Sequence, residues 1–146
     1  MEISRRDLCA IFPAAALLTA LPLESQTSET LATSQVFPFD KLPVHQSASG
    51  VQMRPVLKGK LPTGELLEVH ETLLPAGTMP HPPHHHLHSE LWLVREGTVE
   101  LTVQGVGRRV GPGGVGFAAS NQEHSINNVG NGPAQYFVVA IGSGAA

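Results

Sequence analysis

Short runs of alternating apolar and polar residues fill the chain from residue 51 onward. In the run at 65–74, Leu67, Val69 and Leu73 lie on one face of an extended strand, and polar residues lie on the other. A continuous apolar run at 91–94 indicates a strand covered on both sides. Gly- and Pro-rich turns separate the remaining runs, which cover residues 51–57, 98–103, 108–110, 115–118, 124–129 and 135–141. The pattern predicts an all-β sandwich or barrel, because no later segment has a helical period.

The composition limits the fold and the possible ligands. A chain of 146 residues with 41% hydrophobic and 14% charged residues corresponds to one globular domain. Its net charge of -3 gives no basic excess, so we expect no nucleic-acid partner. The single cysteine, Cys9, excludes an internal disulfide and a Cys-rich zinc site. Any bound metal must therefore be held by nitrogen and oxygen.

The first residues have the pattern of an export signal. Arg5 and Arg6 precede an apolar stretch from Ala10 to Leu23, which is too short to span a bilayer comfortably. The paired arginines resemble the twin-arginine motif of bacterial export, although a short amphipathic helix is the alternative. We therefore expect a signal peptide and flexible leader over residues 1–34 and a single barrel domain over 35–146. The mature protein would be periplasmic or secreted, without stable membrane insertion.

A histidine-rich stretch carries the candidate chemistry. In an extended strand alternate residues share a face, so His84, His86 and Glu90 are expected to point the same way. His124 is the single histidine downstream of His88 and is the candidate for the fourth ligand. Three neutral imidazoles and one carboxylate suit one divalent ion of Fe, Mn, Ni, Zn or Cu.

These residues resemble the two motifs of the cupin superfamily. The first motif is matched by Gly77, His84-x-His86, Glu90 and Gly97. The second motif is matched by Pro112-Gly113, His124 and Asn128. The resemblance implies a small single-domain β-barrel of the jelly-roll type, with His84, His86, Glu90 and His124 binding the metal inside it.

The resemblance extends from about Val36 to Ile141, and it implies a lead-in strand at Val36–Phe39. It departs from the usual second motif at Gly114 and at Ala119-Ser120-Asn121. Asn121 stands where a glycine is more usual and is expected to adopt a left-handed turn conformation.

The other histidines have two interpretations each. His85 has the opposite parity to the ligands and is expected in solvent or at an interface. His88 shares the ligand parity and is either a spare ligand or a pocket residue, the second being favoured. His70 either enters the barrel near the metal or is a hydrogen-bonded structural histidine. His88 and His70 are the candidates for catalytic proton transfer, and His81 is expected to be exposed at the rim.

Three further positions also have alternatives. Trp92 shares the parity of Glu90 and either lines the pocket or packs in the core. Tyr136 has the same ambiguity. Asn128 either supports the site from behind the ligands or ends a strand.

The metal site favours a metal-dependent enzyme, of dioxygenase or lyase/isomerase type, acting on a small oxygenated organic molecule. The alternative is a non-catalytic module that binds a small ligand or a metal outside the cytoplasm, and a structural metal is a third possibility. A homodimer is expected, because an outer apolar stripe that includes Leu91 and Leu93 would be covered by pairing.

Overall fold

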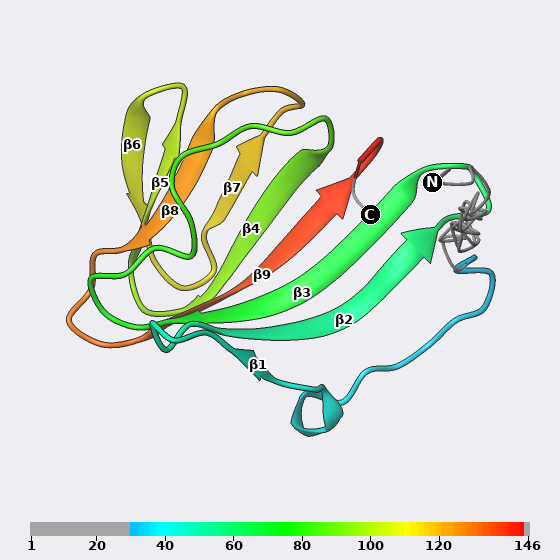
Figure 1. Cartoon of the computed structure of the whole chain (residues 1–146), viewed down its shortest axis with the longest axis horizontal. Coiled ribbons are helices and arrows are strands. Elements are labelled where there is room, and N and C mark those ends of the chain that lie inside the picture. The colour runs from blue at the N-terminus through cyan, green and yellow to red at the C-terminus, as the bar shows by residue number, and fades with distance from the viewer. Residues whose placement is uncertain (1–29, 145–146) are drawn as a thin grey trace, which may run out of the picture.

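The computed structural model describes residues 30–144, whose strands form two antiparallel sheets (Figure 1). The larger sheet has the strand order β1-β2-β3-β9-β4-β7, and the smaller one has the order β6-β5-β8. The strands are β1 (His45–Gln46), β2 (Gln52–Lys60), β3 (Leu66–Leu74), β4 (Ser89–Glu96), β5 (Val99–Val103), β6 (Val106–Val110), β7 (Val115–Ala118), β8 (His124–Asn128) and β9 (Ala134–Ile141). The predicted all-β jelly-roll fold is confirmed.

The predicted strands match the observed ones closely. The largest difference in length is in β4, which extends the predicted run 91–94 to Ser89–Glu96. β2 also runs on to Lys60, because Gly59 and Lys60 pair with Leu67 and Leu66. The turn at Gly97 needs a glycine: its φ is 80°, and an added Cβ would lie 2.7 Å from the Ala134 Cα. Asn121 has a φ of 60°, which confirms the left-handed turn.

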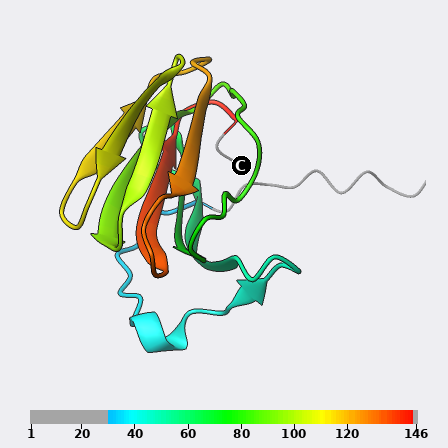
Figure 2. The same cartoon turned by 90° about the vertical axis from the view of Figure 1, so that its left-hand side faces the viewer.

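The predicted lead-in strand at Val36–Phe39 is wrong. The segment belongs to no strand, and a 3-10 helix, η1 (Phe39–Lys41), follows Pro38. The Phe39 ring lies under two guanidinium groups instead, 4.9 Å from the Arg54 Cζ and 4.6 Å from the Arg95 Cζ. This cation–π stacking holds the segment against the sheet, although the segment forms no strand of it. Figure 2 shows η1, in cyan, below the two sheets.

Most of the predicted signal and leader, including Arg5 and Arg6, lies outside the described residues. Of the leader, Thr30 forms a parallel bridge with Lys60, and the Leu31 amide donates to the Lys60 carbonyl at 2.9 Å. No helix in residues 30–144 is long and apolar enough to cross a membrane. The signal and the domain boundary stay predictions.

The core lies between the two sheets. Its buried side chains come from both, and the largest are Trp92, Tyr136, Leu74, Val99, Leu101 and Ile126. Burial of side chains of this size stabilises the fold by about 1.5–3 kcal/mol each. Because side chains alternate between the two faces of a strand, the residues between these core positions point outward.

The outer face of the larger sheet carries apolar residues. Leu91 pairs with Phe117, and Leu93 pairs with Val115. Leu93, Val115 and Phe117 are 40%, 57% and 56% exposed. Leu93 therefore has the outward direction that its parity predicts.

A buried ion pair lies on the same face, where β2 pairs with β3. Glu71 is completely buried, and its Oε2 accepts a hydrogen bond from the Arg54 Nη1 at 2.9 Å. Arg54 also donates to the Gln52 Oε1 at 3.2 Å. The Arg54 guanidinium also lies over the Phe39 ring, so the segment at η1 helps to cover the pair.

Candidate metal centre

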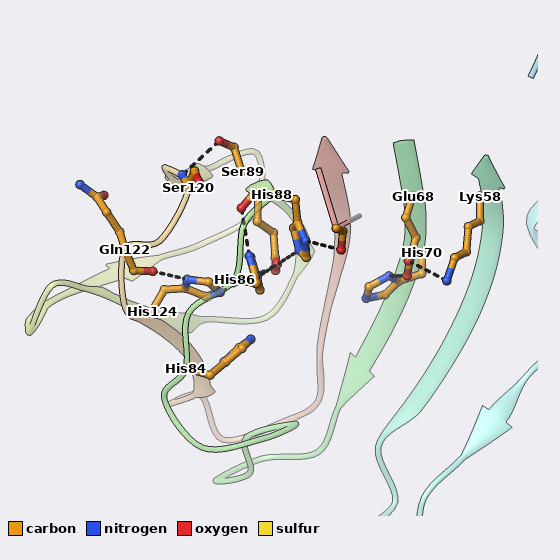
Figure 3. A network of polar contacts seen from close by, with 12 residues as sticks. Lys58, Glu68, His70, His84, His86, His88, Ser89, Ser120, Gln122 and His124 are labelled. Carbon is orange, nitrogen blue, oxygen red and sulfur yellow. Dashed lines mark hydrogen bonds and ion pairs between the residues drawn. The ribbon is translucent and has the colours of Figure 1, made fainter. Parts of the chain in front are cut away.

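The predicted histidine ligands lie close together, His124 on β8 and His84 and His86 in the segment before β4 (Figure 3). His84 and His124 exchange backbone hydrogen bonds of 3.1 and 2.9 Å in an antiparallel bridge. The His124 ring centroid lies 4.6 Å from that of His84 and 4.6 Å from that of His86. Glu90, on β4, reaches His86 with its Oε2 at 2.9 Å.

The prediction that one extended strand carries these ligands is wrong in part. The argument from strand parity placed His84, His86 and Glu90 on one extended strand, but β4 begins at Ser89. Pro82 and Pro83 have no amide hydrogen for a sheet ladder. The bridge between His84 and His124 therefore holds the start of this segment, and β4 holds its end.

Each of the four histidines of the cluster, His84, His86, His88 and His124, is oriented by a backbone carbonyl. A carbonyl oxygen only accepts, so each facing Nδ1 must carry the hydrogen and donate it. The four bonds are His84 to Pro82 at 3.3 Å, His86 to His88 at 3.0 Å, His88 to Gly144 at 2.9 Å and His124 to Gln122 at 2.8 Å. In the neutral rings the Nε2 atoms are then acceptors, as metal binding requires.

The Nε2 atoms of three of these rings surround the Glu90 Oε2, and the contact with His86 is a hydrogen bond when that ring nitrogen carries a proton. The Glu90 Oε2 lies 2.9 Å from the Nε2 of His86, 3.6 Å from that of His88 and 3.9 Å from that of His124. The His124 Nε2 is buried and has no hydrogen-bond partner among residues 30–144. A buried acceptor without a donor is costly, and a cation among these atoms would remove that cost. The residues therefore fit a metal ion.

Burial prepares two of the rings for a metal. It lowers the pKa of His124 and that of His84, and nearby histidines lower the pKa of His84 further. Both rings therefore remain neutral to lower pH than an ordinary histidine, and the neutral ring is the form that binds metal.

Two overlapping triads could hold an ion. One consists of His84, His86 and His124, and the other of His86, His88 and Glu90. The first offers three nitrogens, and the second offers two nitrogens and a carboxylate oxygen, as expected for a site without cysteine. This donor set suits Fe, Mn, Ni, Zn or Cu, and it does not select among them.

A cavity of about 290 Å³ opens beside the site. Glu90 and His124 form part of its wall. Its remaining lining is mostly apolar or aromatic and consists of Val51, Met53, Pro80, Trp92, Ile126, Tyr136 and Val138, with His70, Thr72, His81 and Ser125 as polar members. A small molecule in this cavity would touch the candidate ligands. Trp92 is both core and pocket residue, so its two interpretations are both correct.

His70 faces this cavity from β3 (Figure 3). Its Nδ1 lies 3.4 Å from the Glu68 Oε1, in a geometry too poor for a hydrogen bond, and is otherwise without a partner in the described part of the chain. Glu68 also lies 3.6 Å from the Lys58 Nζ. Burial lowers the pKa of His70, and Glu68 opposes that effect. His70 therefore enters the barrel, as one of its two interpretations predicts.

The sequence argument missed three polar residues near the cavity. Thr72 and Ser125 line it, and Glu68 contacts His70. Glu68 and Thr72 share the parity of His70 on β3, so the alternation there could have identified them. Nothing in the local sequence marks Ser125.

The remaining candidates have simpler roles. His85 is exposed, as expected. His81 is exposed, yet its ring centroid lies 4.2 Å from that of His84 at the cavity wall. Asn128 donates to the carbonyls of Leu74 and Gly132 at 2.7 and 2.9 Å, which makes it a loop support away from the ligands.

Comparison with known proteins agrees with this fold. Residues 70–140 match the model of the family described as Cupin domain. No curated protein matches the chain.

Several solved structures share the fold at low sequence identity. An RmlC-like cupin from Shewanella frigidimarina is similar with a TM-score of 0.63 and 19% identity, over 76% of this chain and 94% of that one. A predicted oxalate decarboxylase from Thermotoga maritima is similar with a TM-score of 0.63 and 20% identity, over 74% and 99%. KdgF from Halomonas sp. is similar with a TM-score of 0.63 and 19% identity, over 74% and 94%.

Identities this low establish the fold and no activity. The family match covers the stretch from His70 through the histidine cluster to β9. Residues 70–140 therefore match the cupin family, and the fold shared with the solved cupin structures agrees with that match.

Proposed function

We propose that this protein is a metal-dependent enzyme acting on a small oxygenated organic molecule, by dioxygenase or lyase/isomerase chemistry. One observation carries the proposal: imidazole Nε2 atoms oriented by backbone carbonyls surround the Glu90 Oε2 at the wall of a cavity. A purely structural metal would need no such cavity. A cavity of about 290 Å³ lies at the small end of the range for ligand sites.

In this proposal His84, His86, Glu90 and His124 hold one divalent ion. Such an ion supplies Lewis-acid chemistry and, if it is iron, activation of O2. The protein contributes the orientation of the ligands. The Nδ1 bonds fix the ring positions, and the partly buried carboxylate supplies negative charge.

His70 is the residue proposed to move a proton to or from the bound molecule. It lines the cavity, and burial lowers its pKa, so the ring is a neutral base at neutral pH. Glu68, 3.4 Å from its Nδ1, favours the charged form that the ring acquires on taking up a proton. Trp92 and Tyr136 would bind the apolar part of the molecule and limit the entry of water.

A non-catalytic ligand-binding module is the second candidate, because the cavity has few polar groups to direct a reaction. The test begins with metal analysis of untagged protein. A pooled screen of small oxygenated molecules follows, with and without O2. Turnover that follows metal content and is lost in His124→Ala, but kept in His85→Ala, supports the enzyme. Ligand binding without turnover supports the module.

We also propose export and pairing, which the described residues leave open. Fractionation of cells that produce the full chain tests export: replacing Arg5 and Arg6 by lysine should retain the protein in the cytoplasm. Pairing would cover Leu93, Val115 and Phe117 on the outer sheet face. Analytical ultracentrifugation should show a dimer that Phe117→Glu converts to a monomer, whereas Val106→Glu, on the smaller sheet, should leave it unchanged.

A further inference from the structure

We infer that His88 is a fifth donor to the same metal ion, in addition to the four proposed ligands. The inference rests on the proposed metal centre and assigns a role other than the proton transfer expected from the sequence. It follows from the direction of one ring nitrogen and from what surrounds it.

The His88 ring is fixed in place at two points. It stacks on the His86 ring, with 3.4 Å between centroids and 17° between planes. Its Nδ1 lies 2.9 Å from the Gly144 carbonyl and therefore donates to it. These contacts leave the Nε2 as the free acceptor of the neutral ring.

That acceptor faces another acceptor. The Nε2 of His88 lies 3.6 Å from the Glu90 Oε2, and the two side chains are 14% and 12% exposed. A lone pair and a carboxylate held this close repel each other unless a proton or a metal ion lies between them. His86 has the same relation to Glu90 at 2.9 Å. In His88, as in the three proposed histidine ligands, a backbone carbonyl accepts from the Nδ1 and so orients the ring.

The position of His88 argues against its acting on a substrate. His88 does not belong to the residues that line the 290 Å³ cavity, whereas His70 does. Its Nε2 is directed at Glu90, which forms part of the cavity wall. Proton transfer requires contact with the reacting molecule, directly or through one water, and His70 is the better placed histidine.

One ion, and not two, would take these donors. His86 belongs to both candidate triads, and its Nε2 has a single lone pair while its Nδ1 donates to the His88 carbonyl. Two ions could therefore not both use His86. With five protein donors, an octahedral ion keeps one exchangeable position, whereas four donors leave two. A molecule in the cavity would then bind the ion through one atom.

The test uses the full chain loaded with Zn(II), comparing wild type with His88→Gln and, as a matched control, His85→Gln. Glutamine keeps an amide that can donate to Gly144 but removes the ring nitrogen. Calorimetry should show metal affinity at least about tenfold weaker in His88→Gln, and unchanged in His85→Gln, which alters an exposed neighbour. A crystal structure of the loaded wild type should place the His88 Nε2 about 2.0–2.1 Å from the zinc.

The outcomes separate the inference from the proposal beneath it. A zinc ion bound by His84, His86, Glu90 and His124, with the His88 Nε2 more than about 3 Å away, overturns the inference and keeps the metal centre. Weaker affinity in His88→Gln with that same geometry also overturns it, since His88 would then only orient Glu90. A wild-type protein that binds no divalent metal overturns both.

Discussion

Two acidic residues on the larger sheet, Glu71 and Glu90, are both withdrawn from solvent but have opposite surroundings. Glu71, on the outer face, is fully buried and paired with the Arg54 guanidinium at 2.9 Å. Glu90, on the inner face, has no arginine or lysine partner in residues 30–144 and faces the Nε2 atoms of His86, His88 and His124.

The two surroundings suit different roles, Glu71 for the stability of the fold and Glu90 for a candidate metal site. The cation beside Glu71 is part of the chain and cannot leave, so this carboxylate serves the fold alone. The groups around Glu90 are oriented to receive a cation from solution, beside a cavity. A carboxylate paired with arginine therefore marks structure here, and one surrounded by acceptor nitrogens marks a site.

Breaking the Glu71 pair should have the largest effect on stability. Arg54→Met leaves a fully buried carboxylate without its cation, which should lower the free energy of unfolding by about 3–5 kcal/mol. Urea denaturation measures the change. The double variant Arg54→Met/Glu71→Leu should recover most of it, and metal affinity should be unchanged in the folded fraction. A stability loss below 1 kcal/mol, as for a surface pair, would contradict this account of Glu71.

Metal binding should stabilise the inner-face site by a smaller amount. With Zn(II) free at a hundred times its Kd, the wild type should gain about 2.7 kcal/mol in the free energy of unfolding. His124→Ala removes a buried ligand nitrogen and should abolish the gain, whereas His85→Ala should keep it. Urea denaturation with and without metal measures both. Equal stabilisation of wild type and His124→Ala would show that the ion binds elsewhere.

Acid should weaken the inner face of the metal-free protein. Burial lowers the pKa of His70 below its ordinary value of 6.5, so the unfolded chain takes up this proton first as the pH falls. The free energy of unfolding should therefore decrease from pH 6.5 downward until the folded-state pKa is passed.

The check is urea denaturation at several pH values, with His70→Gln as the comparison. The variant has no titrating ring at this position and should show a shallower decrease between neutral and mildly acidic pH. His84 and His124 shift in the same direction and should account for part of what remains. An identical pH profile in wild type and variant would remove His70 from this explanation.

The smallest effect should come from the exposed ion pair of Lys58 with Glu68, the residue that contacts His70. The Lys58 Nζ lies 3.6 Å from the Glu68 Oε2, and the two side chains are 56% and 30% exposed. Lys58→Ala should lower the free energy of unfolding by less than about 1 kcal/mol and leave metal affinity unchanged. A decrease in the free energy of unfolding as large as that of Arg54→Met would mean that the difference in exposure does not explain the different strengths of the two ion pairs.

The sequence alone predicted most of the strands and the candidate ligands. Alternation with a period of two is a local property, so it predicts β3 and the outward direction of Leu93 without knowledge of the partners. The spacing of His84, His86 and Glu90 likewise identified candidate ligands before any geometry was known. The similarity to cupin motifs supplied His124, which lies far along the chain.

Only the tertiary structure decided how these residues meet. Three contacts join segments that are far apart in sequence. They are the bridge from His84 to His124, the bond from His88 to the Gly144 carbonyl, and the ion pair of Arg54 with Glu71. Register between strands and the direction of side chains outside strands are set by packing, which local patterns do not encode. For that reason the sequence predicted which residues form the site, and the fold decided which nitrogen each of them offers.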